Sequence, residues 1–155
     1  MIKVLFVCWG NICRSPMGEY ILKDMVKKRG LEECFYIESA ATSTEEIGNP
    51  VYPPARAELR KHGIDCNGHH ARQVRPEDYE RFDYIVGMED IHIKIMKQRM
   101  FAAFGGDPEG KLRLCMDFTK HKGQQVDDPW YTGDFSGVYR QIAEGCEGII
   151  KEAGF

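Results

Sequence analysis

The sequence predicts an α/β fold in which a parallel sheet lies between two layers of helices, a three-layer sandwich. Segments typical of buried strands alternate along the chain with segments of helical periodicity. The 155 residues and the 43% hydrophobic content suffice for one buried core, and no repeat, low-complexity tract or linker divides the chain. We therefore expect a single domain over residues 1–155.

The first predicted strand runs from Ile2 to Val7, a short run of mostly apolar, β-branched and aromatic residues. Such a run is typical of a strand buried on both faces. A loop from Cys8 to Ser15 follows, and we expect the next helix to begin with Ser15 as its N-cap and Pro16 at its first position. Gly30 marks the expected end of this helix.

Three more strands and three more helices are expected in alternation. The strands are predicted at 34–40, 82–88 and 112–116. The helices are predicted at 53–62, closed by Gly63, at 89–101, and over a last segment with apolar residues every three or four positions: Phe135, Val138, Ile142, Cys146, Ile149 and Ala153. Parallel sheets bind ligands at the carboxyl ends of their strands, so the loop that begins at Cys8 is the expected site.

Composition excludes several classes of partner. The 21 basic and 24 acidic residues give a net charge of −3, which indicates neither nucleic acid nor an anionic membrane as the main partner. The apolar N-terminal run is too short for a signal peptide, and no stretch approaches the ~18 apolar residues of a membrane span. We therefore expect a cytoplasmic protein whose six cysteines are free thiols.

Residues 8 to 16 read Cys-Trp-Gly-Asn-Ile-Cys-Arg-Ser-Pro, with five residues between Cys8 and Arg14. Backbone N–H groups of a strand-to-helix loop converge on one concavity, and the helix dipole adds positive potential there. Gly10 and Asn11 tolerate the left-handed conformations that such a tight loop requires. The segment therefore predicts an anion site.

The same potential favours a thiolate, because helix N-termini and cations lower a cysteine pKa from its usual value near ~8.5. Cys8 is thus a candidate nucleophile toward phosphorus. Arg14 offers a planar fork for two phosphate oxygens, and Ser15 can donate a hydrogen bond to the sulfur. A cysteine and an arginine at this spacing also occur by chance; the preceding strand and the following Ser-Pro and helix make the interpretation specific.

This loop resembles the signature of the low-molecular-weight protein tyrosine phosphatases. Residues 127–131, Asp-Asp-Pro-Trp-Tyr, are similar to the acid loop of that family, and 38–43 and 69–74 also match family segments, all in the same order. The resemblance implies a four-stranded parallel sheet, flavodoxin-like and of the phosphotyrosine protein phosphatase I-like type. It implies hydrolysis of phosphotyrosine through a cysteinyl phosphate, the partner being a tyrosine-phosphorylated protein or a small aryl phosphate.

The departing phenolate needs a proton, and a carboxylic acid can supply it and later deprotonate the attacking water. The family places its acid directly before the proline, so the resemblance indicates Asp128, with Asp127 as second choice. A simple turn is the alternative interpretation of Asp-Pro. Trp130 and Tyr131 are expected to form a wall of the substrate pocket. Trp9 stands where the family usually has leucine and would narrow the mouth or add a stacking surface.

The phosphate-binding and supporting residues are then Trp9, Gly10, Asn11, Ile12, Cys13, Ser15, Ser43 and His69. Among these, Asn11, Ser43 and His69 match a family network that holds the loop in shape, although His70 could serve in place of His69. No metal or organic cofactor is implied. A zinc site at His62, Cys66, His69 and His70 is disfavoured because the chain has no Cys-x2-Cys pair.

Alternatives on the same scaffold differ at particular residues. Arsenate reductases need a redox cysteine pair after the third strand, and residues 80 to 100 contain no cysteine. Protein-arginine phosphatases have a threonine where Ile12 stands, and an apolar wall leaves the N–H groups of a phosphoguanidinium unpaired. A non-catalytic phosphoprotein-binding module would lack the nucleophile or the acid, and this chain keeps both.

Cys8 and Cys13 are too far apart in sequence for a thioredoxin-like Cys-x-x-Cys motif. Their shared loop instead suggests a reversible disulfide that protects Cys8 from oxidation. The sequence leaves the oligomeric state open.

Overall fold

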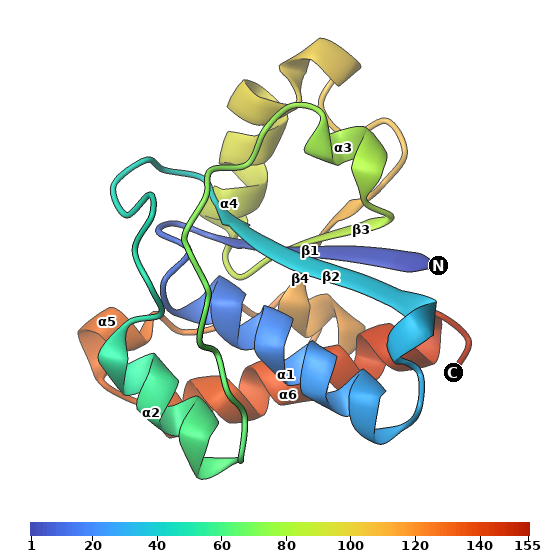
Figure 1. Cartoon of the computed structure of the whole chain (residues 1–155). Coiled ribbons are helices and arrows are strands. Elements are labelled where there is room, and N and C mark those ends of the chain that lie inside the picture. The colour runs from blue at the N-terminus through green and yellow to red at the C-terminus, as the bar shows by residue number, and fades with distance from the viewer.

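A four-stranded sheet lies between two groups of helices in the computed structural model, which describes residues 1–155 (Figure 1). The strands are β1 (Ile2–Cys8), β2 (Phe35–Ala41), β3 (Tyr84–Gly87) and β4 (Leu112–Leu114). The α-helices are α1 (Arg14–Lys28), α2 (Pro53–Lys61), α3 (Asp78–Arg81), α4 (Asp90–Ile95), α5 (Pro129–Thr132) and α6 (Phe135–Glu152). Short 3-10 turns occur at Glu32–Cys34, Ala102–Phe104 and Cys115–Phe118, and a π-helical turn at Met96–Met100.

All four strands are parallel and lie in the order β2-β1-β3-β4. Near the end of β1, Val7 pairs with Ala40 of β2 on one side and with Gly87 of β3 on the other. The strand order reverses at β1, and α1 and α4 leave the ends of β1 and β3 toward opposite faces of the sheet (Figure 1). Such a switch point opens a crevice at the carboxyl ends of the strands, which is where Cys8 lies.

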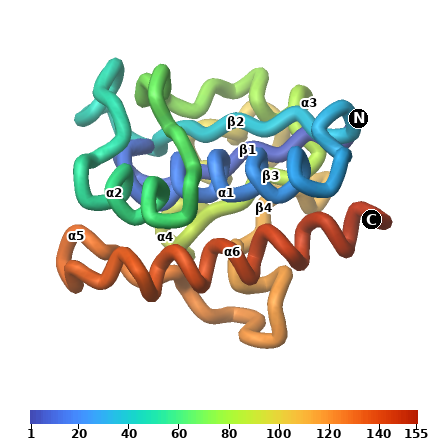
Figure 2. The backbone as a smooth tube through the Cα atoms, turned by 60° about the horizontal axis from the view of Figure 1, so that its bottom comes forward, coloured from blue at the N-terminus to red at the C-terminus, as the bar shows by residue number.

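The two faces of β1 pack into different apolar clusters. Val4 and Phe6 belong to the core between the sheet and helices α1 and α6, which lie side by side in Figure 2. Leu5 and Val7 belong to the core on the other face, below α3 and the turns after α4. A strand covered on both faces needs apolar residues at every position, so the predicted three-layer sandwich with a parallel sheet is confirmed.

The predicted start of the first helix is wrong. Helix α1 begins at Arg14 with Cys13 as N-cap, so Ser15 lies inside the first turn and Pro16 is its third residue. The Ser15 hydroxyl bonds the sulfur of Cys8 instead of capping the helix backbone. Proline is still tolerated at this position because the first N–H groups of a helix have no partner within it.

Other element boundaries differ by a few residues. Helix α4 ends at Ile95 and continues as the π-helical turn, which closes where the backbone N–H of Phe101 donates to the carbonyl of Met96 at 2.8 Å. The last strand stops at Leu114 and gives way to a 3-10 turn. No helix has the length and apolar character needed to cross a membrane.

Candidate active site

The loop between β1 and α1 is shaped around Asn11, the one non-glycine residue with a positive φ, at 59°. Asn11 is fully buried, and both polar atoms of its side chain form hydrogen bonds. Its Nδ2 donates to Ser15 Oγ at 2.8 Å and to Ser39 Oγ at 2.9 Å, while its Oδ1 accepts from the backbone N–H of Arg72 at 3.2 Å. The carbonyl of Asn11 bonds His69 Nε2 at 2.8 Å. These contacts hold a conformation that L-residues otherwise adopt rarely.

Cys8 lies at the bottom of the loop and is 4% exposed. Its Sγ is 2.9 Å from Ser15 Oγ, and the backbone N–H of Ser15 donates to it at 3.4 Å. Because Ser15 Oγ already accepts from Asn11, its own proton is free to point at the sulfur. The amino-terminal turn of α1 adds positive potential beside the sulfur.

Cys13, the second cysteine of the loop, also lines the pocket. Burial raises its pKa to about 12, with further contributions from Cys8 and Asp128. Cys13 is therefore a protonated thiol at neutral pH and a poor candidate for the nucleophile.

Arg14 is 3% exposed and its guanidinium is held from three directions. Its Nη1 donates to the carbonyl of Val126 at 2.8 Å. Its Nη2 lies 2.7 Å from Glu89 Oε2 and 3.5 Å from Asp128 Oδ2. The fork of the arginine is thus oriented before any anion binds.

Glu89 and His92 were not expected at the site. Glu89 is the N-cap of α4, and a reciprocal capping box joins it to His92. The Nδ1 of His92 accepts from the backbone N–H of Met88 at 3.3 Å and of Glu89 at 3.1 Å. Burial, with a smaller effect of Arg14, lowers the pKa of His92 to about 3. A neutral His92 therefore holds Glu89, the residue that contacts Arg14. The sequence signal for this capping box is a glutamate followed three residues later by a polar side chain.

Asp128 and Asp127 face different hollows. Asp128 is the N-cap of α5, where its Oδ1 accepts from the backbone N–H of Trp130 at 3.1 Å. It lines the same pocket as Cys8, while Asp127 lines a separate hollow against α6. Of the two adjacent aspartates, only Asp128 thus shares a pocket with Cys8.

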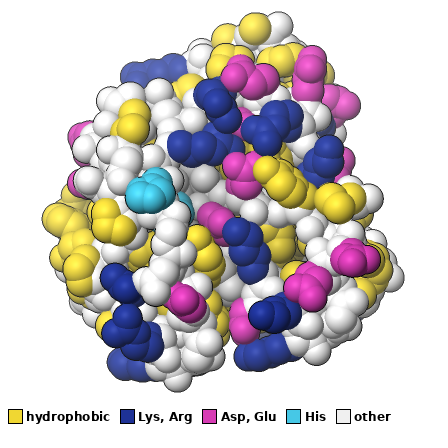
Figure 3. All heavy atoms as spheres, viewed as in Figure 1, with side chains coloured by type: hydrophobic (Ala, Val, Ile, Leu, Met, Phe, Trp, Pro, Cys, Tyr) yellow, Lys and Arg dark blue, Asp and Glu magenta, His cyan; other side chains and the backbone are white.

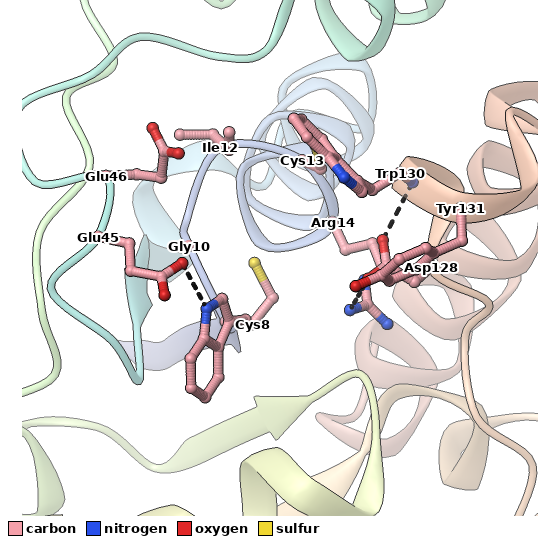
Figure 4. Close-up of a pocket in the computed structure, with 11 residues that line it drawn as sticks. Cys8, Gly10, Ile12, Cys13, Arg14, Glu45, Glu46, Asp128, Trp130 and Tyr131 are labelled. Atoms are coloured by element: carbon pink, nitrogen blue, oxygen red, sulfur yellow. Dashed lines mark hydrogen bonds and ion pairs between the residues drawn. The ribbon is translucent and has the colours of Figure 1, made fainter.

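The pocket has a volume of about 260 Å³ and its lining includes Trp9, Ile12, Trp130 and Tyr131. The indole N–H of Trp9 donates to Glu45 Oε2 at 2.9 Å, which fixes this ring at the rim. Glu45 and its neighbour Glu46 lie across the pocket from Asp128 and Tyr131 (Figure 4). Aromatic faces above a buried anion site suit a phenyl ring that carries a phosphate.

The supporting residues contact the loop at different points. Ser43 Oγ donates to the carbonyl of Trp9 at 2.8 Å, so it contacts the loop but not Asn11. Ser39, which sequence reasoning missed, takes the place beside Asn11 and donates to the buried Glu19 at 2.5 Å. His69 bonds the loop, whereas the exposed His70 lies near the carbonyl of Gly48 instead.

A thiol, an arginine and a carboxyl group around one anion-binding loop are the groups that phosphoryl transfer through a cysteine requires. A sequence model described as "Low molecular weight phosphotyrosine protein phosphatase" matches residues 3–154. The chain belongs to this family of low-molecular-weight protein-tyrosine phosphatases.

Individual relatives agree over nearly their whole length. The chain is 40% identical to the low molecular weight protein-tyrosine-phosphatase YfkJ of Bacillus subtilis over 151 residues, 97% of this chain and 94% of the relative. The human low molecular weight phosphotyrosine protein phosphatase is 34% identical over 153 residues, 97% and 95% of the two chains. The YfkJ crystal structure superposes with a TM-score of 0.90 at 38% identity, covering 98% and 94%. A Drosophila arginine phosphatase superposes with a TM-score of 0.88 at 33% identity, covering 99% of each chain.

Proposed function

We propose that the protein is a protein-tyrosine phosphatase that hydrolyses phosphotyrosine monoesters through a phosphorylated cysteine. One observation carries the proposal: Cys8, Arg14 and Asp128 line a single pocket whose walls are aromatic. Membership in a family of protein-tyrosine phosphatases supports the same reaction. Tyrosine-phosphorylated proteins and small aryl phosphates are the proposed substrates.

In the first step, the thiolate of Cys8 attacks phosphorus. The S–P bond forms as the bond between phosphorus and the phenolic oxygen breaks, and the carboxyl group of Asp128 gives its proton to that oxygen. Arg14 and the backbone N–H groups of the loop bind the equatorial oxygens and stabilise their charge.

In the second step, a water molecule attacks the phosphocysteine. The carboxylate of Asp128 accepts a proton from the water, the S–P bond breaks, and inorganic phosphate is released. The departing thiolate of Cys8 is stabilised by the hydroxyl of Ser15, which lies 2.9 Å from it. The enzyme thereby returns to its initial state.

Substrate binding also changes the partner of Asp128. In the free protein its Oδ2 lies 3.5 Å from Arg14 Nη2. A phosphate dianion competes for that nitrogen, which releases the carboxyl group to turn toward the leaving oxygen. Glu89, which lies 2.7 Å from the same nitrogen, and the carbonyl of Val126 on Nη1 keep the fork of Arg14 in place.

The remaining residues have supporting roles in the proposal. Gly10, Ile12 and Cys13 complete the phosphate loop. Asn11, Ser15, Ser43 and His69 hold it in shape, while Trp9, Trp130 and Tyr131 flank the phenyl ring.

The free state of all six cysteines supports a reducing location such as the cytoplasm. A protective Cys8–Cys13 disulfide predicts that dithiothreitol restores peroxide-inactivated enzyme.

Phosphoarginine is the second candidate substrate, because one structural neighbour is named an arginine phosphatase. Ile12 lines the pocket and offers no hydrogen-bond acceptor from its side chain to the N–H groups of a phosphoguanidinium. Leaving such groups unpaired costs about 1–3 kcal/mol, so the proposal favours the phenolic ester.

Hydrolysis of phosphotyrosine, phosphoarginine and phosphoserine peptides by the wild type and Cys8→Ser, without added metal, tests the proposal. We expect turnover of phosphotyrosine that vanishes in Cys8→Ser, while phosphate binding is retained. Turnover confined to phosphoarginine would overturn the substrate and keep the mechanism. Tight phosphopeptide binding with no turnover at all would favour a binding module.

A further inference from the structure

A second hollow adjoins the catalytic pocket. It shares Ile12 and Glu46 with that pocket and runs between residues 49–52 and one face of α2. Its volume is about 560 Å³, against about 260 Å³ for the catalytic pocket. The hollow thus has room for more than one side chain, and we call it the α2 groove.

Basic residues line the α2 groove along the helix. Pro53, Arg56, Ala57 and Arg60 follow the i, i+3, i+4, i+7 spacing of one helix face, and all four are exposed. Arg56 bonds the neutral amide of Asn67, and neither arginine forms an ion pair. Figure 3 shows basic side chains gathered over α2 at the lower left. The two guanidinium groups are therefore available to an anionic partner.

The floor of the α2 groove is tied to the phosphate loop. The backbone N–H of Tyr52 donates to the carbonyl of Ile12 at 2.8 Å, and the Tyr52 ring packs against Trp130 with centroids 4.9 Å apart. Pro50 and Val51 add apolar surface. A chain leaving the catalytic pocket over Ile12 would enter the groove at a fixed distance and direction from Cys8.

We propose that the α2 groove binds the peptide segment beside the phosphotyrosine of a protein substrate, and that Arg56 and Arg60 select acidic side chains in that segment. The inference rests on the proposed function. Glu46 stands at the junction of the two hollows, where it accepts from Asn49 at 2.6 Å, and Glu45 lines the catalytic pocket beside it. These carboxylates repel acidic residues directly next to the phosphotyrosine, so the selection applies to residues farther along.

The proposal can be tested with phosphotyrosine peptides that differ in two flanking residues. The pair is Asp-Asp, Ala-Ala or Lys-Lys, and it begins two positions from the phosphotyrosine, on its N-terminal side in one series and on its C-terminal side in another. For the wild type we expect kcat/KM to be about threefold to tenfold higher with Asp than with Lys on one side of the phosphotyrosine, as two exposed ion pairs allow. The preference should decrease at high salt. Arg56→Glu/Arg60→Glu should abolish or reverse it.

Lys97→Glu/Arg99→Glu is the matched control, because it changes net charge equally at exposed positions in the helical layer on the other face of the sheet. It should keep the wild-type preference, and all three proteins should hydrolyse a small aryl phosphate alike. A wild type indifferent to flanking charge, or equal losses in both double variants, would overturn the proposal.

The same peptides can be compared without turnover. Fluorescence anisotropy of labelled peptides on Cys8→Ser, with and without the two arginine substitutions, measures the flank preference as affinity. Absence of hydrolysis by the wild type would overturn the proposed function. Equal affinities for Asp and Lys peptides would overturn the proposal that the α2 groove selects acidic residues.

Discussion

At the scale of the residue, Asn11 shows what local sequence can and cannot predict. Its tolerance of a left-handed backbone is intrinsic, so a positive φ in this loop was predictable and is observed. Its partners Ser39 and Arg72 lie 28 and 61 residues away, and only the folded chain brings them to it. Ser39 and Ser43 both lie near the end of β2, and only the folded chain shows that Ser39 bonds Asn11 while Ser43 bonds the carbonyl of Trp9.

Replacing Asp128 by alanine removes the proposed proton donor and leaves Cys8 and Arg14 in place. We expect kcat to fall by about 10²–10⁴ for phenyl phosphate, whose leaving group needs the proton. The first step should change far less for an aryl phosphate with an acidic phenol. Pre-steady-state release of the two phenols measures this, and equal losses would argue against Asp128 as the acid.

At the scale of the element, the start of α4 provides a positioning device that joins the sheet to the site. Strand β3 ends at Gly87, and the next residues place Glu89 against Arg14 and its backbone N–H against His92 Nδ1. The sequence predicted a strand and a helix here but not their junction, because a capping box also occurs at helices remote from any site. Only the pairing of β3 beside β1 brings Glu89 to Arg14.

His92→Leu and His92→Asn separate this role from simple packing. Leucine leaves the N–H groups of Met88 and Glu89 without their acceptor, whereas the amide oxygen of asparagine can take the place of Nδ1. We expect His92→Leu to raise the inhibition constant of phosphate about tenfold or more and His92→Asn to restore most of the loss. An unchanged inhibition constant in His92→Leu would contradict a role in orienting Arg14.

The pH dependence of stability follows from the same histidine. Burial lowers the pKa of His92 from 6.5 to about 3, so between these values the unfolded chain binds a proton that the folded protein does not. Stability from this group is complete above pH 6.5 and decreases as the pH falls, by about 1.4 kcal/mol per unit. Urea unfolding from about pH 7 to about pH 5 should show a loss about 2 kcal/mol larger in the wild type than in His92→Asn. Parallel losses would contradict the assignment.

At the scale of the whole molecule, the alternation of strands and helices was enough to predict a parallel three-layer fold. The order of the strands in the sheet could not be predicted from local sequence patterns, because buried strands of a parallel sheet are similar in composition. The three-residue β4 is an example: Leu112 and Leu114 fill the core, yet nothing in their sequence specifies the edge of the sheet.

A single domain over the whole chain predicts one cooperative unfolding transition. Strand β1 contributes Phe6 to the core under α1 and Leu5 to the core on the other face, so neither layer can unfold without exposing the other. Tryptophan fluorescence reports on Trp9 and Trp130 beside the pocket, whereas far-ultraviolet circular dichroism reports on all helices. We expect coincident urea midpoints, and two separate midpoints would indicate more than one folding unit.

The central claim is that a phosphoryl group passes through the sulfur of Cys8. Asp128→Ala mixed with an aryl phosphate of acidic phenol should load the cysteine quickly and release it slowly, because the base for the second step is missing. Rapid acid quench followed by peptide mass spectrometry should then find one phosphoryl group on the peptide that contains Cys8. A burst of phenol with no phosphorylated peptide, or with phosphate on any residue other than Cys8, would contradict the account.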